Sequence, residues 1–147
     1  MRKVIGIGHA AAGDDAVALR VVELLAGCAD VVLRKCMDPT DLIGEMDGAS
    51  DMILVDALVG AGNAGEVRWL DLENLREERV ADTHGMTVVS ALELASRVLA
   101  ELPPVRILGI CIDPPRGFDL RLSAAAEDGA ARAASMIREA LACTNPL

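Results

Sequence analysis

Short, continuously apolar segments alternate along this chain with longer segments whose apolar residues recur at helical spacing. Continuous apolar runs are typical of strands that are buried on both faces of a parallel sheet. The expected strands cover 3–8, 29–35, 51–57, 66–72 and 105–113, and the expected helices cover 14–27, 38–46, 86–102 and 123–143. This order predicts an α/β fold with three α/β/α layers and a mostly parallel, twisted sheet of about five strands.

Local signals predict where some of these elements begin and end. Asp56 is expected to end the third strand, Pro39 to lie just inside the short helix, and Ser123 to cap the last helix. Segment 66–72 alternates between apolar and polar residues, which predicts a half-exposed strand. Since the sequence contains no linker, repeat or low-complexity segment, we expect residues 1–147 to form a single domain.

The composition argues against several classes of partner. A net charge of −9 disfavours binding to polyanions, and an aromatic content of 1% leaves few side chains on which bases could stack, so we expect no nucleic acid partner. No apolar run approaches the ~18 residues of a membrane span, and no signal-peptide pattern is present, so we expect a cytoplasmic protein. The four cysteines lack CxxC spacing and are expected to be reduced, buried thiols.

Reactive side chains are concentrated where the expected strands end. In an open parallel sheet, ligands bind beyond the carboxyl ends of the strands. The candidates at this edge are His9, Asp14, Asp15, Asp38, Asp56, His84 and Asp113, with His84 in the segment that precedes the long helix. The predicted functional site therefore lies at the carboxyl edge of the sheet.

A nucleotide site is one interpretation of the first of these loops. The sequence GIGHAA fits the pattern G-x-G-x-x-G/A after a strand. That pattern binds a pyrophosphate through the positive end of the following helix. Asp14 and Asp15 stand at that end here, and their negative charges would repel a phosphate. We therefore disfavour nucleotide binding.

A cation site is the opposite interpretation. Asp15, Asp56 and His84 offer two carboxylates and one imidazole, a mixed donor set that suits Ni(II) or Zn(II) with positions left open. The same residues also have ordinary structural explanations. Acidic residues are favoured in the first turn of a helix, and an aspartate commonly forms a turn. From the residues alone, both explanations stay open.

Taken together, several short motifs resemble the hydrogenase maturation proteases. That family has a strand followed by G-x-G-N and D-[DE]-G-x-G before a valine-rich helix, an Asp after the second strand, V-D-A before a glycine loop, a histidine before a helix, and L-S opening the last helix. The corresponding segments are GIGHAAAGDDAVALRVVELL, CMDPTDLI, LVDALVGAGNAGEV, THGMTVVSALELA and LGICIDPPRGFDLRLS. They follow one another in the family's order over nearly the whole chain.

The resemblance implies an endopeptidase that removes a short C-terminal tail from the large-subunit precursor of a nickel–iron hydrogenase. It assigns nickel contacts to Asp15, Asp56 and His84. The nickel is already loaded in the precursor, so no cofactor is expected to be permanently bound. The enzyme is expected to work as a monomer on this nickel-loaded precursor. Two other functions remain alternatives: a non-catalytic nickel-recognising assembly chaperone on the same fold, and a nucleotide-binding domain.

Further roles follow from the resemblance for neighbouring residues. Asp14 would orient the loop and accept hydrogen bonds from backbone donors, whereas Asp15 reaches the metal. Asp15 and Asp38 are the candidate catalytic residues, and Asp38 would position the scissile peptide or activate water. Alternatively, Asp38 only forms the turn before Pro39. His9 replaces the family's Asn. It is either a further metal ligand or a residue that replaces the hydrogen bond of that Asn, and we favour the second interpretation.

Overall fold

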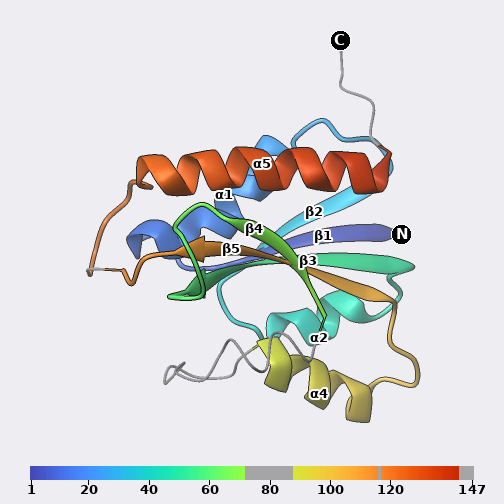
Figure 1. Cartoon of the computed structure of the whole chain (residues 1–147). Coiled ribbons are helices and arrows are strands. Elements are labelled where there is room, and N and C mark those ends of the chain that lie inside the picture. Colours follow the sequence, from blue (N-terminus) through green and yellow to red (C-terminus); the bar gives the residue numbers. More distant parts are fainter. Residues whose placement is uncertain (72–87, 116, 143–147) are drawn as a thin grey trace.

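The computed structural model describes residues 1–71, 88–115 and 117–142, and in these residues it has one five-stranded sheet with the strand order β2-β1-β3-β5-β4 (Figure 1). The strands are β1 (Arg2–Ile7), β2 (Val31–Cys36), β3 (Asp51–Val59), β4 (Val67–Leu70) and β5 (Val105–Ile112). All neighbouring strands pair in parallel except β4, which is antiparallel to β5. The predicted mostly parallel sheet is confirmed.

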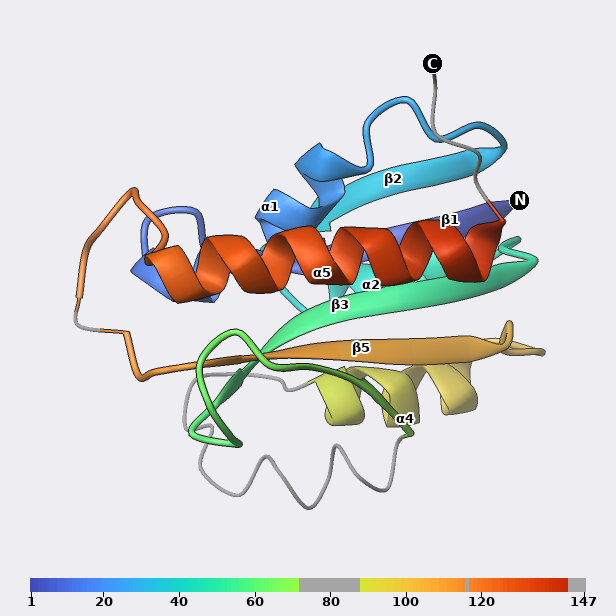
Figure 2. The ribbon, with the colours of Figure 1, turned by 45° about the horizontal axis from the view of Figure 1, so that its top comes forward.

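Helices cover both faces of this sheet, as predicted. Helices α1 (Val17–Leu24) and α5 (Ala124–Leu141) lie on one face, and α2 (Asp41–Met46) and α4 (Val88–Val98) lie on the other (Figures 1 and 2). Successive side chains of β3 point to opposite faces and contribute to the hydrophobic core on each face of the sheet. Val55 packs with α1 and α5, whereas Leu54 and Leu58 pack with α2 and α4. Within the described residues, no helix is long and apolar enough to cross a bilayer.

Helix α5, the longest in the described part of the chain, packs closely because its buried face consists of small residues. Ala130 and Ala133 are fully buried, and a Cβ added at Gly129 would lie 3.1 Å from Cα of Gly65 in the loop before β4. Ser123 caps this helix as predicted, since its side chain accepts a hydrogen bond from the backbone N–H of Ala126. Small side chains thus place the start of α5 close to the loops at the carboxyl edge.

Three of the expected boundaries were wrong. Asp56 does not end the third strand, because pairing with β5 continues through Val59, opposite Ile112. Pro39 precedes the short helix, which begins at Asp41. The first helix is preceded by a 3-10 turn, η1 (Gly13–Ala16), that carries both Asp14 and Asp15.

Candidate active site

The strand register places Asp56 at the carboxyl edge even though it lies inside β3. Gly6 of β1 pairs with Val55, so Asp56 is level with Ile7, the last residue of β1. Its side chain alternates with those of Leu54 and Leu58 and therefore belongs to the α2 and α4 face. Asp56 is 5% exposed and is the one buried charged residue in the described part of the chain. Burying a carboxylate is costly, which marks this position as a candidate functional residue.

Asp15 lies on η1, in the loop that follows β1. It is half-buried, and its Oδ2 accepts a hydrogen bond of 3.1 Å from the backbone N–H of His9. The turn can lie this close to β1 because residue 8 is glycine: an added Cβ would be 2.2 Å from the carbonyl oxygen of Asp15. The described residues form no hydrogen bond to the other carboxylate oxygen, Oδ1 of Asp15. That oxygen can therefore serve as a ligand or a base.

Asp14, the neighbouring carboxylate, has a structural role. Its Oδ1 accepts from the backbone N–H of Ser123 and its Oδ2 accepts from the Ser123 hydroxyl, each at 2.7 Å. The expectation that Asp14 accepts from backbone donors and fixes the loop is confirmed. Ser123 was predicted only as a helix cap, and its contact with Asp14 was missed because no local signal links residues 109 positions apart.

Asp38 is exposed and forms the turn that follows β2. Its Oδ1 accepts from the N–H of Thr40 at 2.9 Å, and its carbonyl oxygen accepts from the N–H of Asp41 at 3.0 Å. The hydrogen bond from the Thr40 backbone lowers the pKa of the Asp38 carboxyl, and the Thr40 side chain acts in the same direction. The turn-forming alternative is therefore realised. A catalytic role for Asp38 stays a prediction, and this carboxylate is ionised at neutral pH.

His9 is exposed, and its backbone N–H rather than its ring contacts Asp15. The described residues contain no group of three His, Cys, Asp or Glu side chains that could hold a metal ion. His9 thus does not complete a three-ligand cluster with Asp15 and Asp56. His84, the third ligand implied by the resemblance, lies outside the described residues, so the expected triad stays a prediction.

Of the three cysteines in the described part, Cys36 and Cys111 are buried as expected, whereas Cys28 is only partly buried. Cys36, at the end of β2, is buried, and burial raises the pKa of its thiol to about 11, with the carboxylates of Asp41 and Glu45 adding to the effect. Such a thiol is protonated at neutral pH. Cys111 is fully buried in β5, where its Sγ is 3.4 Å from Nη2 of Arg68. Neither Cys36 nor Cys111 is therefore a candidate nucleophile.

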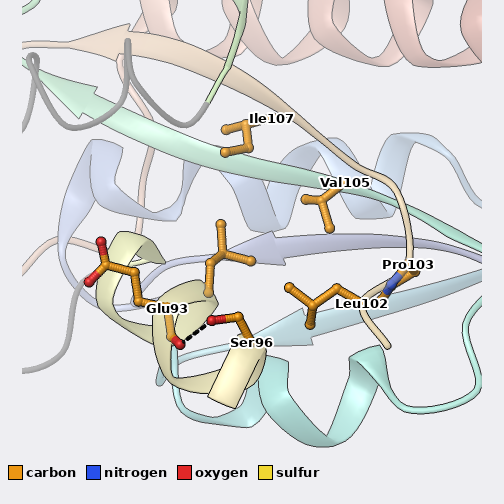
Figure 3. Close-up of a pocket in the computed structure, with 7 residues that line it drawn as sticks. Glu93, Ser96, Leu102, Pro103, Val105 and Ile107 are labelled. Atoms are coloured by element: carbon orange, nitrogen blue, oxygen red, sulfur yellow. Dashed lines mark hydrogen bonds between the residues drawn. The ribbon is translucent and has the colours of Figure 1, made fainter. Parts of the chain in front are cut away.

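A pocket of about 330 Å³ lies elsewhere, between α4 and the start of β5 (Figure 3). It is lined by Leu92, Glu93, Ser96, Leu102, Pro103, Val105 and Ile107. Because Val105 is the first residue of β5, this pocket is at the amino end of that strand. It is not part of the candidate site at the carboxyl edge.

Comparison with known proteins shows the family of this chain. The sequence model of the hydrogenase maturation protease family, HycI, matches residues 35–140, which is more than half of the chain. The chain belongs to the hydrogenase maturation protease family. It is therefore an endopeptidase, and the nucleotide-binding alternative is not supported. A search of curated protein sequences finds no match.

Solved structures of the family share the fold. The hydrogenase maturation protease HycI from Thermococcus kodakarensis is 25% identical, with a TM-score of 0.75 over 96% of this chain and 92% of that one. The endopeptidase HycI from Escherichia coli is 21% identical, with a TM-score of 0.77 over 95% of this chain and 90% of that one. The maturating endopeptidase HybD from Escherichia coli is 22% identical, with a TM-score of 0.73 over 97% and 93%.

Proposed function

We propose that this endopeptidase removes a short C-terminal tail from the nickel-loaded large-subunit precursor of a nickel–iron hydrogenase. The observation that carries the proposal is the buried carboxylate of Asp56, level with the end of β1, in a chain of the maturation protease family. A carboxylate that is buried at this edge of the sheet is a suitable group to meet a cation that the substrate supplies.

In this proposal the nickel ion belongs to the substrate. Asp15 and Asp56 each offer a carboxylate and His84 an imidazole, and this mixed set of oxygen and nitrogen donors suits Ni(II). The free oxygen of Asp15 supports its assignment, since the other oxygen is held by the N–H of His9. The protease would thereby recognise a precursor that has received its metal and ignore one that has not.

Peptide hydrolysis then needs a group that moves a proton. The attacking water forms the new carbon–oxygen bond and loses a proton, the carbon–nitrogen bond breaks, and the leaving amine gains a proton. A carboxylate can make both transfers. Asp38 is ionised at neutral pH and lies at the same edge, so it is a candidate base, as is Asp15. Water activated by the substrate's own nickel is the other route.

The test is an incubation of this protein with a large-subunit precursor, prepared with and without nickel, that is read by intact mass. We expect the nickel-loaded precursor to lose a short C-terminal peptide and the nickel-free precursor to stay intact. An unchanged mass together with a stable complex would favour the chaperone alternative. Cleavage that proceeds equally well without nickel would contradict the recognition role of the metal.

Variants connect the reaction to the site. We expect Asp15→Asn, Asp56→Asn and His84→Ala each to reduce cleavage by about 10²-fold or more, while the folded state is retained. Asp113→Asn is the matched control, because Asp113 is an exposed aspartate at the same edge, directly after β5. Wild-type cleavage by all three site variants would overturn the assignment.

A further inference from the structure

Two adjacent carboxylates on η1 have different partners. Both oxygens of Asp14 accept hydrogen bonds from Ser123, one from its N–H and one from its hydroxyl. Asp15 has one oxygen held by the N–H of His9. Each oxygen of Asp14 thus has a partner within the protein, whereas Asp15 keeps one oxygen for a ligand.

The Ser123 hydroxyl connects Asp14 to helix α5. It donates its proton to Oδ2 of Asp14 and accepts from the N–H of Ala126, so its hydrogen-bonding capacity is well used. The Asp14 carboxylate therefore lies at the N-terminus of α5, where the helix dipole favours negative charge. Because α5 is anchored by its buried alanine face, this end of the helix is a firm support for the loop.

Backbone hydrogen bonds also join the loop after β1, which leads into η1, to the loop before α5. The N–H of Gly13 donates to the carbonyl oxygen of Asp119 at 2.9 Å, and the N–H of Asp119 donates to the carbonyl oxygen of Ala11 at 3.0 Å. On the other side, η1 rests against Gly8. Both views of the ribbon show the loop before α5 beside the loop after β1 (Figures 1 and 2). The turn that carries Asp15 is therefore packed between the loop before α5 and Gly8.

We propose that Asp14 and Ser123 are a positioning pair that fixes the direction of the Asp15 carboxylate, without contacting the substrate themselves. If Asp14 is released, η1 keeps its backbone contacts but loses the charged anchor next to Asp15. The carboxylate of Asp15 then samples other directions, and the hydrogen bond from the N–H of His9 weakens. This inference rests on the proposed function only in taking Asp15 to act in cleavage.

The first readout requires no substrate. The amide proton resonance of His9 reports its hydrogen bond to Asp15, and we expect Ser123→Ala to move it upfield. Ser123→Thr, which keeps the hydroxyl, should restore the wild-type position. Ala131→Gly is the control, because it weakens α5 at an exposed position without touching the pair. An unmoved His9 resonance in Ser123→Ala, or an equal shift in Ala131→Gly, would overturn the proposal.

The second readout is cleavage of the precursor. We expect Ser123→Ala to lower kcat about 10-fold to 100-fold and to leave KM nearly unchanged, since a positioning group acts on the geometry of reaction. Asp14→Asn should have a similar effect, and the double variant should be no slower than the worse single variant. If the double variant instead lost kcat by the product of the two single effects, Asp14 and Ser123 would not act as one pair. Should the wild-type protein not cleave the precursor, the proposed function fails, whereas the His9 resonance still decides whether the pair exists.

Discussion

Gly8 is the residue at which the candidate site leaves no space for a side chain. An added Cβ would be 2.2 Å from the carbonyl oxygen of Asp15, and a backbone atom cannot rotate away from such a contact. The strand and the turn that carries Asp15 would have to separate to make room. A substitution at Gly8 is therefore expected to affect both the stability of the fold and the position of Asp15, the proposed nickel-contacting residue.

We expect Gly8→Ala to lower the free energy of unfolding by about 1–3 kcal/mol, as overpacking usually does, and to reduce precursor cleavage more than this loss of stability explains. Urea denaturation and cleavage of the precursor measure the two effects. Gly44→Ala is the matched control, because a Cβ at this exposed position of α2 meets nothing within 4 Å. It should stabilise the protein by about 0.5–1 kcal/mol. Equal effects of the two substitutions would contradict the close contact at Gly8.

At the scale of residues, the sequence predicted the candidates but not their partners. Asp14 and Asp15 are adjacent and chemically identical, so only their partners distinguish them: Ser123 for Asp14 and the N–H of His9 for Asp15. The different roles of the two aspartates were stated from the family resemblance, and only that of Asp14 is confirmed by its contacts. Asp56 was identified from its motif, whereas its burial depends on the register between β1 and β3.

At the scale of elements, α5 shows how small side chains permit close packing. Ala130 is fully buried in the core shared with α1, and Ala131 is exposed on the same helix. We expect Ala130→Leu to destabilise the protein by about 1–3 kcal/mol, because enlarging a fully buried side chain usually overpacks the core. Ala131→Leu should change stability by less than about 0.5 kcal/mol. Thermal or urea unfolding of both variants tests this prediction. Equal free energies of unfolding would show that α5 can move away from the sheet to accommodate the larger side chain without loss of stability.

The elements themselves were largely predictable because each apolar run is continuous where a strand is buried on both faces. The errors occur where tertiary contacts extend or interrupt a local pattern. The aspartate after the apolar run 52–55 predicted the end of a strand, since Asp is uncommon in strands, but β3 continues to pair with β5 through Val59. The apolar spacing of the first helix gave no sign of η1, whose shape depends on Gly13 at a positive φ of 55° and on the loop before α5.

At the scale of the whole molecule, the parallel sheet brings the loops after β1, β2, β3 and β5 to one edge, and exposed apolar residues gather there. Met37 and Val59 are 60% and 49% exposed, and Phe118 and Leu120 are 81% and 73% exposed. Asp119, between the last two, is hydrogen-bonded to the loop of the candidate site. Asp119 forms an isolated parallel bridge with Ala12, so the exposed side chains of Phe118 and Leu120 flank a residue that contacts this loop.

These two side chains are therefore expected to contact the precursor next to the reacting peptide. Phe118→Ser should leave the melting temperature unchanged, since the side chain is already in water, and should raise KM for the precursor about tenfold, as the loss of roughly 1.4 kcal/mol of apolar contact predicts. Leu120→Ser should act in the same direction. Val98→Ser is the control, because Val98 is 63% exposed at the end of α4, on the opposite edge of the sheet. A wild-type KM for Phe118→Ser, or an equal rise for Val98→Ser, would show that the precursor approaches the carboxyl edge without using this loop.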